Sequence, residues 1–252
     1  ARATYKELVE KIKKVSGDYY REGVRRGDIV TILMANTPEA VISIYALNRI
    51  GAVANVVHPL SAQEEIKYYL NSAESKYLLC MDLCLPKIKA IIDETYLTKV
   101  IVASAGNCMP QPLKTAYHFK NKSRKFFPHN DDRYITWSDF SGKKNMTVVE
   151  YLPAGEENDN VAIILHSGGT TGTPKDIMLS NKCFNAFGVQ AVITLRDVSV
   201  GDKILAILPI FHGFGLGVCF HVCFCFGACS IILPSFDSKK FGSLLKKNKP
   251  TL

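Results

Sequence analysis

The densest group of chemically useful residues in this chain of 252 residues lies at 166–175. It reads His-Ser-Gly-Gly-Thr-Thr-Gly-Thr-Pro-Lys and follows an apolar run, 161–165, that is typical of a buried strand. Closely spaced backbone N–H groups, hydroxyl donors and a lysine are suited to hold a polyphosphate. The same composition also occurs in surface turns rich in Gly, Ser and Thr, so composition alone leaves both interpretations open.

The order of the residues distinguishes this loop from two common phosphate motifs. A Walker loop places its lysine directly after glycine, whereas Lys175 follows Pro174, and the spacing of a dinucleotide-binding G-x-G-x-x-G turn does not match either. The order Ser-Gly-Gly-Thr-Thr-Gly-Thr-Pro-Lys instead resembles the phosphate-binding signature of the adenylate-forming superfamily. That superfamily includes acyl-CoA synthetases, luciferases and the adenylation domains of nonribosomal peptide synthetases.

Three further segments extend the resemblance. Residues 5–81, with the Asn-Thr-Pro-Glu turn at 36–39, resemble the N-terminal segment of the superfamily, and Leu-Pro-Ile-Phe-His-Gly at 208–213 resembles its Leu-Pro-x-x-His motif near the acyl pocket. Phe236-Asp237 also fits. The later motifs of the superfamily, which contact adenine, magnesium and ribose, are not found, nor is its small C-terminal domain. We therefore expect part of the large N-terminal domain of a longer protein, rather than a naturally short paralogue.

The resemblance implies a reaction in two steps. A carboxylate attacks the α-phosphorus of Mg·ATP to give an acyl-adenylate and pyrophosphate, and the thiol of coenzyme A or of a carrier protein then displaces AMP. The residues that the resemblance assigns to the phosphates are Ser167, Gly168, Gly169, Thr170, Thr171, Gly172, Thr173 and Lys175. It places His212 beside the acyl carboxylate and the α-phosphate, so Lys175 and His212 are the expected catalytic residues. A turn histidine that only binds a backbone group is the alternative for His212. ATP, Mg²⁺ and CoA are expected as substrates, and no protein metal ligand is assigned.

One residue departs from the pattern, because Asp176 stands where the superfamily usually has glycine. A carboxylate about 6 Å from a phosphate would cost about 3 kcal/mol per unit charge at an effective dielectric constant of about 20. A carboxylate that points into solvent would cost far less. The hypothesis is that nucleotide binding is weakened or altered.

Hydrophobic periodicity predicts an α/β fold with doubly wound, largely parallel sheets and flanking helices. Strands are expected at 29–34, 53–57, 77–81, 100–103, 161–165, 177–179, 204–208 and 230–233. Capping boxes at 4–7 and 61–64 predict two helix starts. We expect a first α/β subdomain at 1–105, an irregular connection at 106–158, and a second α/β segment with the phosphate loop at 159–252.

Composition and charge limit the other functions. The formal net charge is +8, but the basic residues are dispersed, which does not favour a nucleic-acid stripe. Four of the eight cysteines cluster with a histidine at 219–229, and either a zinc site or a set of small buried hydrophobic side chains would explain them. The spacing is helical and the neighbours are apolar, which favours the hydrophobes. Many free thiols indicate a reducing cytoplasm. Glycines and a proline interrupt the apolar stretch 204–236, so it is not predicted to span a membrane.

The leading hypothesis is a fragment of an ATP-dependent acyl-CoA synthetase for a carboxylic acid, with a preference for a fatty acid. The alternatives are amino-acid or aryl-acid adenylation that feeds a carrier protein, and a non-catalytic nucleotide-binding module. We expect the chain by itself to lack the complete ligase activity.

Overall fold

The computed structural model describes residues 2–109, 111–120, 127–142, 159–167, 175–195, 198–234, 236 and 238–251. The chain divides into two compact units. Unit 1 comprises Ala1–Met34 and Ile42–Pro153, and unit 2 comprises Ala35–Val41 and Ala154–Leu252.

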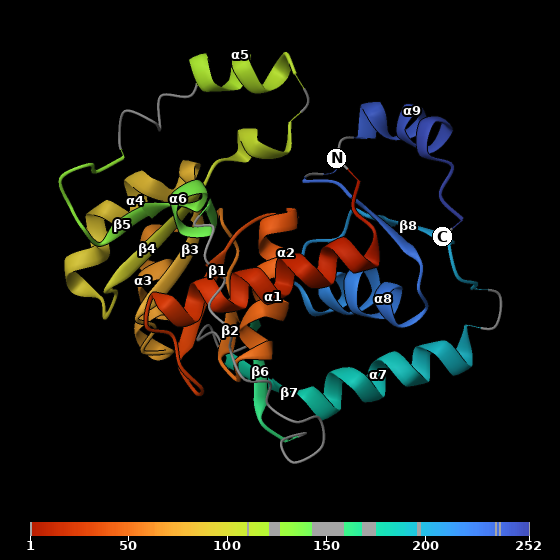
Figure 1. Ribbon diagram of the computed structural model, residues 1–252, viewed down its shortest axis with the longest axis horizontal. Helices are drawn as coiled ribbons and strands as arrows, with labels where there is room; N and C mark the ends of the chain where they lie inside the picture. The colour runs from red at the N-terminus through yellow and green to blue at the C-terminus, as the bar shows by residue number, and fades with distance from the viewer. Residues whose placement is uncertain are drawn as a thin grey trace. The chain divides into compact units, whose positions relative to one another are not determined.

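Unit 1 contains a parallel sheet of five strands in the order β5-β4-β3-β1-β2 (Figure 1). The strands are β1 (Ile29–Leu33), β2 (Val53–Val56), β3 (Tyr77–Met81), β4 (Lys99–Ala103) and β5 (Tyr134–Thr136). The helices along this part of the chain are α1 (Tyr5–Arg21), α2 (Pro38–Arg49), α3 (Gln63–Ser72), α4 (Leu85–Ile91), α5 (Leu113–Lys120) and α6 (Trp137–Gly142), with short 3₁₀ turns η1 (Asp82–Cys84), η2 (Ile92–Glu94) and η3 (Ala105–Cys108). Parallel neighbours require crossover connections, which the helices supply. The predicted α/β class is confirmed.

The strands of unit 1 are apolar on both faces, as expected of a parallel sheet covered by helices. In β1, β3 and β4 every residue after the first is buried, and β2 is buried throughout. The polar side chains inside this sheet bond to one another. Thr31 Oγ1 lies 2.7 Å from Ser75 Oγ, and Asn55 Nδ2 donates to Thr31 Oγ1 at 3.0 Å. The network satisfies polar atoms that would otherwise be costly to bury.

The two predicted capping boxes had different outcomes. Thr4 caps α1, because its side chain accepts the N–H of Glu7 while the Glu7 carboxylate accepts the N–H of Thr4. The prediction at 61–64 was wrong. α3 begins after Ala62, whose methyl side chain cannot accept a hydrogen bond, and the hydroxyl of Ser61 bonds the Glu65 carboxylate instead.

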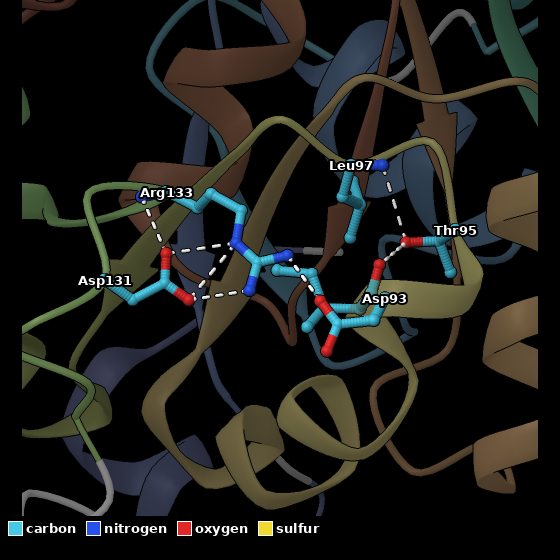
Figure 2. Close-up of polar contacts among 6 residues, drawn as sticks. Asp93, Thr95, Leu97, Asp131 and Arg133 are labelled. Atoms are coloured by element: carbon cyan, nitrogen blue, oxygen red, sulfur yellow. Dashed lines mark hydrogen bonds and ion pairs between the residues drawn. The ribbon is translucent and has the colours of Figure 1, made fainter.

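An arginine ties the 3₁₀ turn η2 to the segment before β5 (Figure 2). Arg133 Nε and Nη2 donate to the carboxylate of Asp131, and Arg133 Nη1 donates to Asp93 Oδ1 at 2.7 Å. The hydrogen bond from Arg133 is the main reason that the pKa of Asp131 lies below its usual value. Nearby, Thr95 Oγ1 accepts the N–H of Leu97. The arrangement fixes one edge of the sheet.

Unit 2 combines an antiparallel hairpin with a parallel strand pair. The hairpin is β6 (Val161–Ser167) and β7 (Lys175–Ser180), the parallel pair is β8 (Lys203–Ala206) and β9 (Cys229–Ile232), and the helices are α7 (Asn181–Thr194), the π-helix η5 (Gly215–Val222), α8 (Cys223–Cys225) and α9 (Ser238–Asn248). α7 directly follows the hairpin (Figure 1). In the described part of the chain, no helix has both the length and the apolar character that crossing a bilayer requires.

The cysteine cluster follows the helical spacing only in part. Cys219 and Cys223 are buried, which confirms their reading as small hydrophobes. Cys225 and Cys229 are exposed, so the expectation that all of these thiols lie in a core was wrong.

Candidate active site

The predicted phosphate loop is the connection of the β6–β7 hairpin. Residues 168–174, and with them Gly168, Gly169, Thr170, Thr171, Gly172 and Thr173, lie outside the described residues. The two ends of the connection are described. Ser167 and Lys175 are directly opposite each other in the antiparallel register, and they are the last residue of β6 and the first of β7. Lys175 is exposed. The strand pairing therefore brings the first and last residues of the predicted loop together.

The next pair in the register contains the residue that departs from the superfamily pattern. His166 is opposite Asp176, and His166 Nδ1 lies 2.8 Å from Asp176 Oδ1. The His166 side chain is only 7% exposed, whereas that of Asp176 is 31% exposed. Because successive side chains of a strand point to opposite faces, Asp176 and Lys175 lie on opposite faces of the hairpin.

His212 lies in a tight turn that follows β8. Its N–H donates to the carbonyl of Pro209 at 3.0 Å, and its Nδ1 accepts the N–H of Phe214 at 3.3 Å. A neutral imidazole whose Nδ1 is an acceptor carries its proton on Nε2, so this bond assigns the tautomer. The His212 side chain is exposed. The ring therefore accepts a hydrogen bond from the backbone N–H of Phe214, and it still offers an Nε2–H donor.

Two glycines set where this turn lies within unit 2. A Cβ atom added at Gly213 would be 3.4 Å from Leu165 Cδ1, so the turn packs beside β6. A Cβ atom added at Gly215 would be 2.0 Å from the carbonyl oxygen of Pro209, closer than any real contact. Only glycine permits this approach of η5 to the turn. His212 and the hairpin that carries Lys175 thus belong to one packed assembly.

An apolar cavity of about 300 Å³ lies beside the turn. It is lined by Leu179 of β7, Phe184 and Phe187 of α7, and Gly213, Phe214 and Gly217. Phe214 is 58% exposed, whereas Leu216 is buried in the core. A Cβ atom at Gly217 would be 2.9 Å from Phe187 Cε1, so glycine there keeps η5 close to α7.

Two titratable side chains near the cavity have shifted pKa values. Cys183 lines the cavity, and hydrogen bonds with the side chain and backbone of Ser180 hold the pKa of its thiol below the usual value. Burial lowers the pKa of His221, whose ring packs edge-on against Phe184 with the ring centroids 5.3 Å apart. Among the described residues, no three His, Cys, Asp or Glu side chains gather in a way that could hold a metal ion.

Comparison with known proteins gives the class. The family of AMP-binding enzymes has a model that matches residues 1–252, and the chain belongs to that family. The predicted membership of the adenylate-forming superfamily is thereby confirmed.

Among its relatives, the long-chain-fatty-acid–CoA ligase of Bacillus subtilis (strain 168) is 26% identical over 250 residues, which cover 99% of this chain and 45% of the relative. The 4-coumarate–CoA ligase 4 of Arabidopsis thaliana is 23% identical, over 99% of this chain and 41% of the relative. The chain thus spans less than half the length of these relatives.

Solved structures agree on the fold. The crystal structure of a long-chain-fatty-acid–CoA ligase from Archaeoglobus fulgidus superposes with a TM-score of 0.79 at 22% identity, covering 98% of this chain and 44% of that one. ATP-bound MatB from Rhodopseudomonas palustris gives a TM-score of 0.75 at 24% identity, covering 96% of this chain and 42% of that one. At these identities the likeness establishes the fold only.

Proposed function

We propose that the protein carrying this chain is an AMP-forming acid–thiol ligase. It activates a carboxylic acid with ATP as an acyl-adenylate and transfers the acyl group to CoA. The observation that carries the proposal is the pairing of Ser167 with Lys175 at the two ends of a Gly/Ser/Thr loop, in the same unit as the His212 turn. MatB from Rhodopseudomonas palustris, which has the same fold, binds ATP, and this supports ATP as the nucleotide.

In the first step, an oxygen of the substrate carboxylate attacks the α-phosphorus, and the bond between that phosphorus and the bridging oxygen of pyrophosphate breaks. Lys175 offers a cation to the departing phosphates, and the loop residues 167–174 offer N–H and hydroxyl donors. His212 donates its Nε2–H toward the carboxylate or the α-phosphate oxygen, because its Nδ1 is engaged by the N–H of Phe214. Mg²⁺ enters with ATP and shields the phosphate charge, and we assign it no ligand from the described residues.

In the second step, a thiolate sulfur attacks the acyl carbon, and AMP leaves with the electron pair of the acyl–phosphate bond. We infer an aliphatic acid as the preferred substrate. The cavity beside the His212 turn is lined by apolar side chains and glycines, with Cys183 as its one thiol, and this chemistry suits a hydrocarbon chain. The fatty-acid ligase relative supports this choice, whereas the 4-coumarate ligase relatives support an aryl acid. We also propose that the protein is cytoplasmic, because its many cysteines suit a reducing compartment.

The test is acid-dependent pyrophosphate exchange by the complete gene product, with saturated fatty acids of graded length, cinnamic acids and amino acids. We expect the fatty acids to give the highest kcat/KM. Faster exchange with cinnamic acids or amino acids would overturn the aliphatic preference, and no exchange with any acid would overturn the ligase. Transfer to a carrier protein but not to CoA would favour peptide synthesis.

Substitutions of two lysines, one at the end of the loop and one outside it, test whether the effect on exchange is specific to the loop. Loss of a charge-assisted hydrogen bond costs about 1.5–3 kcal/mol, so Lys175→Met is expected to lower kcat/KM for exchange by about tenfold to a hundredfold. Lys182→Met is the control, because Lys182 is an exposed lysine in the same unit and lies 3.8 Å from Asp159 in an open ion pair. Equal effects of the two substitutions would contradict the assignment of Lys175.

A further inference from the structure

A buried carboxamide holds the backbone that leads into the His212 turn. Asn36 is 3% exposed. Its Nδ2 donates to the carbonyl of Ala206 at 3.1 Å and to that of Leu208 at 2.9 Å. Its Oδ1 accepts the N–H of Ile210 at 2.7 Å. One side chain thus bonds three backbone groups of the segment 206–210, and all of these residues belong to unit 2.

The spacing of these bonds explains what the amide does. Positions 206, 208 and 210 alternate as they do along one edge of a strand, where a neighbouring strand would offer N–H and C=O groups. β8 ends at Ala206, so the Asn36 amide takes over the hydrogen bonding where the strand pairing stops. The carbonyls of Ala206 and Leu208 can only accept and the Ile210 N–H can only donate, so the amide orientation is fixed.

Asn36 itself has a rigid support. It directly precedes Thr37, which caps α2. Thr37 Oγ1 accepts the N–H of Ala40 at 3.3 Å, and the Thr37 carbonyl accepts the N–H of Val41 at 3.2 Å. Pro38 opens the helix with a φ angle already suited to it. The carboxamide therefore extends from a helix start whose backbone is well determined.

At the other end of this contact, Ile210 lies two residues before His212, the candidate catalytic residue. Ile210 is fully buried, and the N–H of His212 bonds the carbonyl of Pro209 inside the clamped segment. We propose that Asn36 is a positioning residue that fixes the backbone of 206–210 and thereby sets where the His212 imidazole meets the substrate. The catalytic part of this inference rests on the proposed ligase function. The positioning part does not.

A second buried asparagine provides a matched control. Asn55 is fully buried in unit 1, where Nδ2 donates to Thr31 Oγ1 and to the carbonyl of Tyr69. Asn55→Leu and Asn36→Leu make the same chemical change at similar burial, but only Asn36 contacts the His212 turn. Asn36→Asp keeps the size and the acceptor for Ile210 while it removes both donated bonds.

The first measurement does not need activity. Hydrogen exchange of the Ile210 amide and the ring ¹⁵N signals of His212 are recorded by NMR in the complete gene product. Asn36→Leu is expected to accelerate Ile210 exchange by about tenfold or more, because the N–H loses its partner, and to shift the His212 signals. Asn36→Asp should keep the Ile210 protection and still shift His212. Asn55→Leu should leave both unchanged relative to the global stability of each variant.

The second measurement is acid-dependent pyrophosphate exchange. A misplaced reacting group can cost about a hundredfold in rate, so Asn36→Leu is expected to lower kcat by between about tenfold and a hundredfold, with the KM for ATP within about twofold of the wild type. The kcat of Asn36→Asp should lie between those of Asn36→Leu and the wild type. Asn55→Leu should keep the wild-type kcat per folded molecule. If Asn36→Leu does not fold, Asn36→Asp carries the comparison.

The outcomes separate the two ideas. Unchanged His212 signals in the Asn36 variants, or a kcat loss no larger than that of Asn55→Leu, would overturn the positioning role. A wild-type protein without exchange for any acid would overturn the ligase proposal, and the Ile210 and His212 signals would then decide the positioning role by themselves.

Discussion

The two units use buried polar groups in different ways. In unit 1, Asn55 bonds Thr31 and the backbone of Tyr69, so the polar network closes inside the sheet framework. In unit 2, Asn36 directs the same chemical group at an irregular segment next to a candidate catalytic histidine. The first arrangement supports a regular sheet. The second fixes a turn that lies beyond the end of the strand pairing.

The burial of the elements differs in the same sense. β3 of unit 1 is buried after its first residue, whereas β7 of unit 2 is exposed from Lys175 to Met178. In α7 the one buried residue is Gly188, and Ile193 is 67% exposed. Substitutions of buried residues in unit 1 are therefore expected to act on the free energy of unfolding, and those at the exposed hairpin end and the His212 turn of unit 2 mainly on activity.

The largest effect is expected in the core of unit 1. Leu79 of β3 is fully buried, so Leu79→Ala should lower the free energy of unfolding by about 2–5 kcal/mol through lost burial and the cavity left behind. Activity per folded molecule should remain unchanged. Chemical denaturation and pyrophosphate exchange check the two parts. Leu83→Ala is the control, because Leu83 is 56% exposed and should change stability by less than about 0.5 kcal/mol. A stability loss below 1 kcal/mol for Leu79→Ala would contradict the contrast.

A smaller effect on stability, with a larger one on activity, is expected at the turn of unit 2. In Gly215→Ala the new methyl group meets the carbonyl oxygens of Pro209 and Leu208, at 2.0 and 2.8 Å before relaxation. Relief of this clash must move the backbone that carries His212, at a cost of about 1–3 kcal/mol. Thermal unfolding and kcat for pyrophosphate exchange are the measurements, and kcat should fall by more than the stability loss explains.

Gly242→Ala in α9 is the matched control for that turn. Nothing lies within 4 Å of a Cβ atom there, and alanine favours a helix, so stability should rise slightly and kcat should not change. If Gly215→Ala behaves like Gly242→Ala, the close approach of η5 to Pro209 does not set the turn.

The framework was the part most accessible from the sequence. The strands β1 to β4 coincide with predicted strands to within a residue, because short and largely apolar runs are characteristic of strands buried on both faces. β5 was not predicted, since it is short and only its first residue is buried. The π-helical form of η5 also leaves no periodicity by which to recognise it.

The geometry around the candidate site was less accessible, because it depends on contacts between distant residues. The bond from the Ile210 N–H to Asn36 spans 174 residues, and no local pattern reports it. Asn36 and His212 both lie in segments that resemble the superfamily, but the contact between Asn36 and the His212 turn arises only from the tertiary structure. The wrong cap at Ser61 has a similar cause, since its hydroxyl has a competing partner in Glu65.

The smallest effect is expected at Asp176, whose partner the sequence did not reveal. The carboxylate bonds His166 across the hairpin and lies on the face opposite Lys175, so its repulsion on a phosphate should be well below the estimate for an unpaired charge. Because it is also partly exposed and screened, Asp176→Asn is expected to tighten ATP binding by less than about fivefold, or about 1 kcal/mol. Titration calorimetry at two salt concentrations measures the ATP affinity, and the gain should shrink at high salt.

Asp176→Gly removes the bond to His166 as well as the charge. Any difference in ATP affinity between the two variants therefore reports the contribution of the His166–Asp176 bond rather than that of the charge. Tightening of more than tenfold would mean that the carboxylate faces the phosphates, and an unchanged affinity in both variants would remove the hypothesis that this residue alters nucleotide binding.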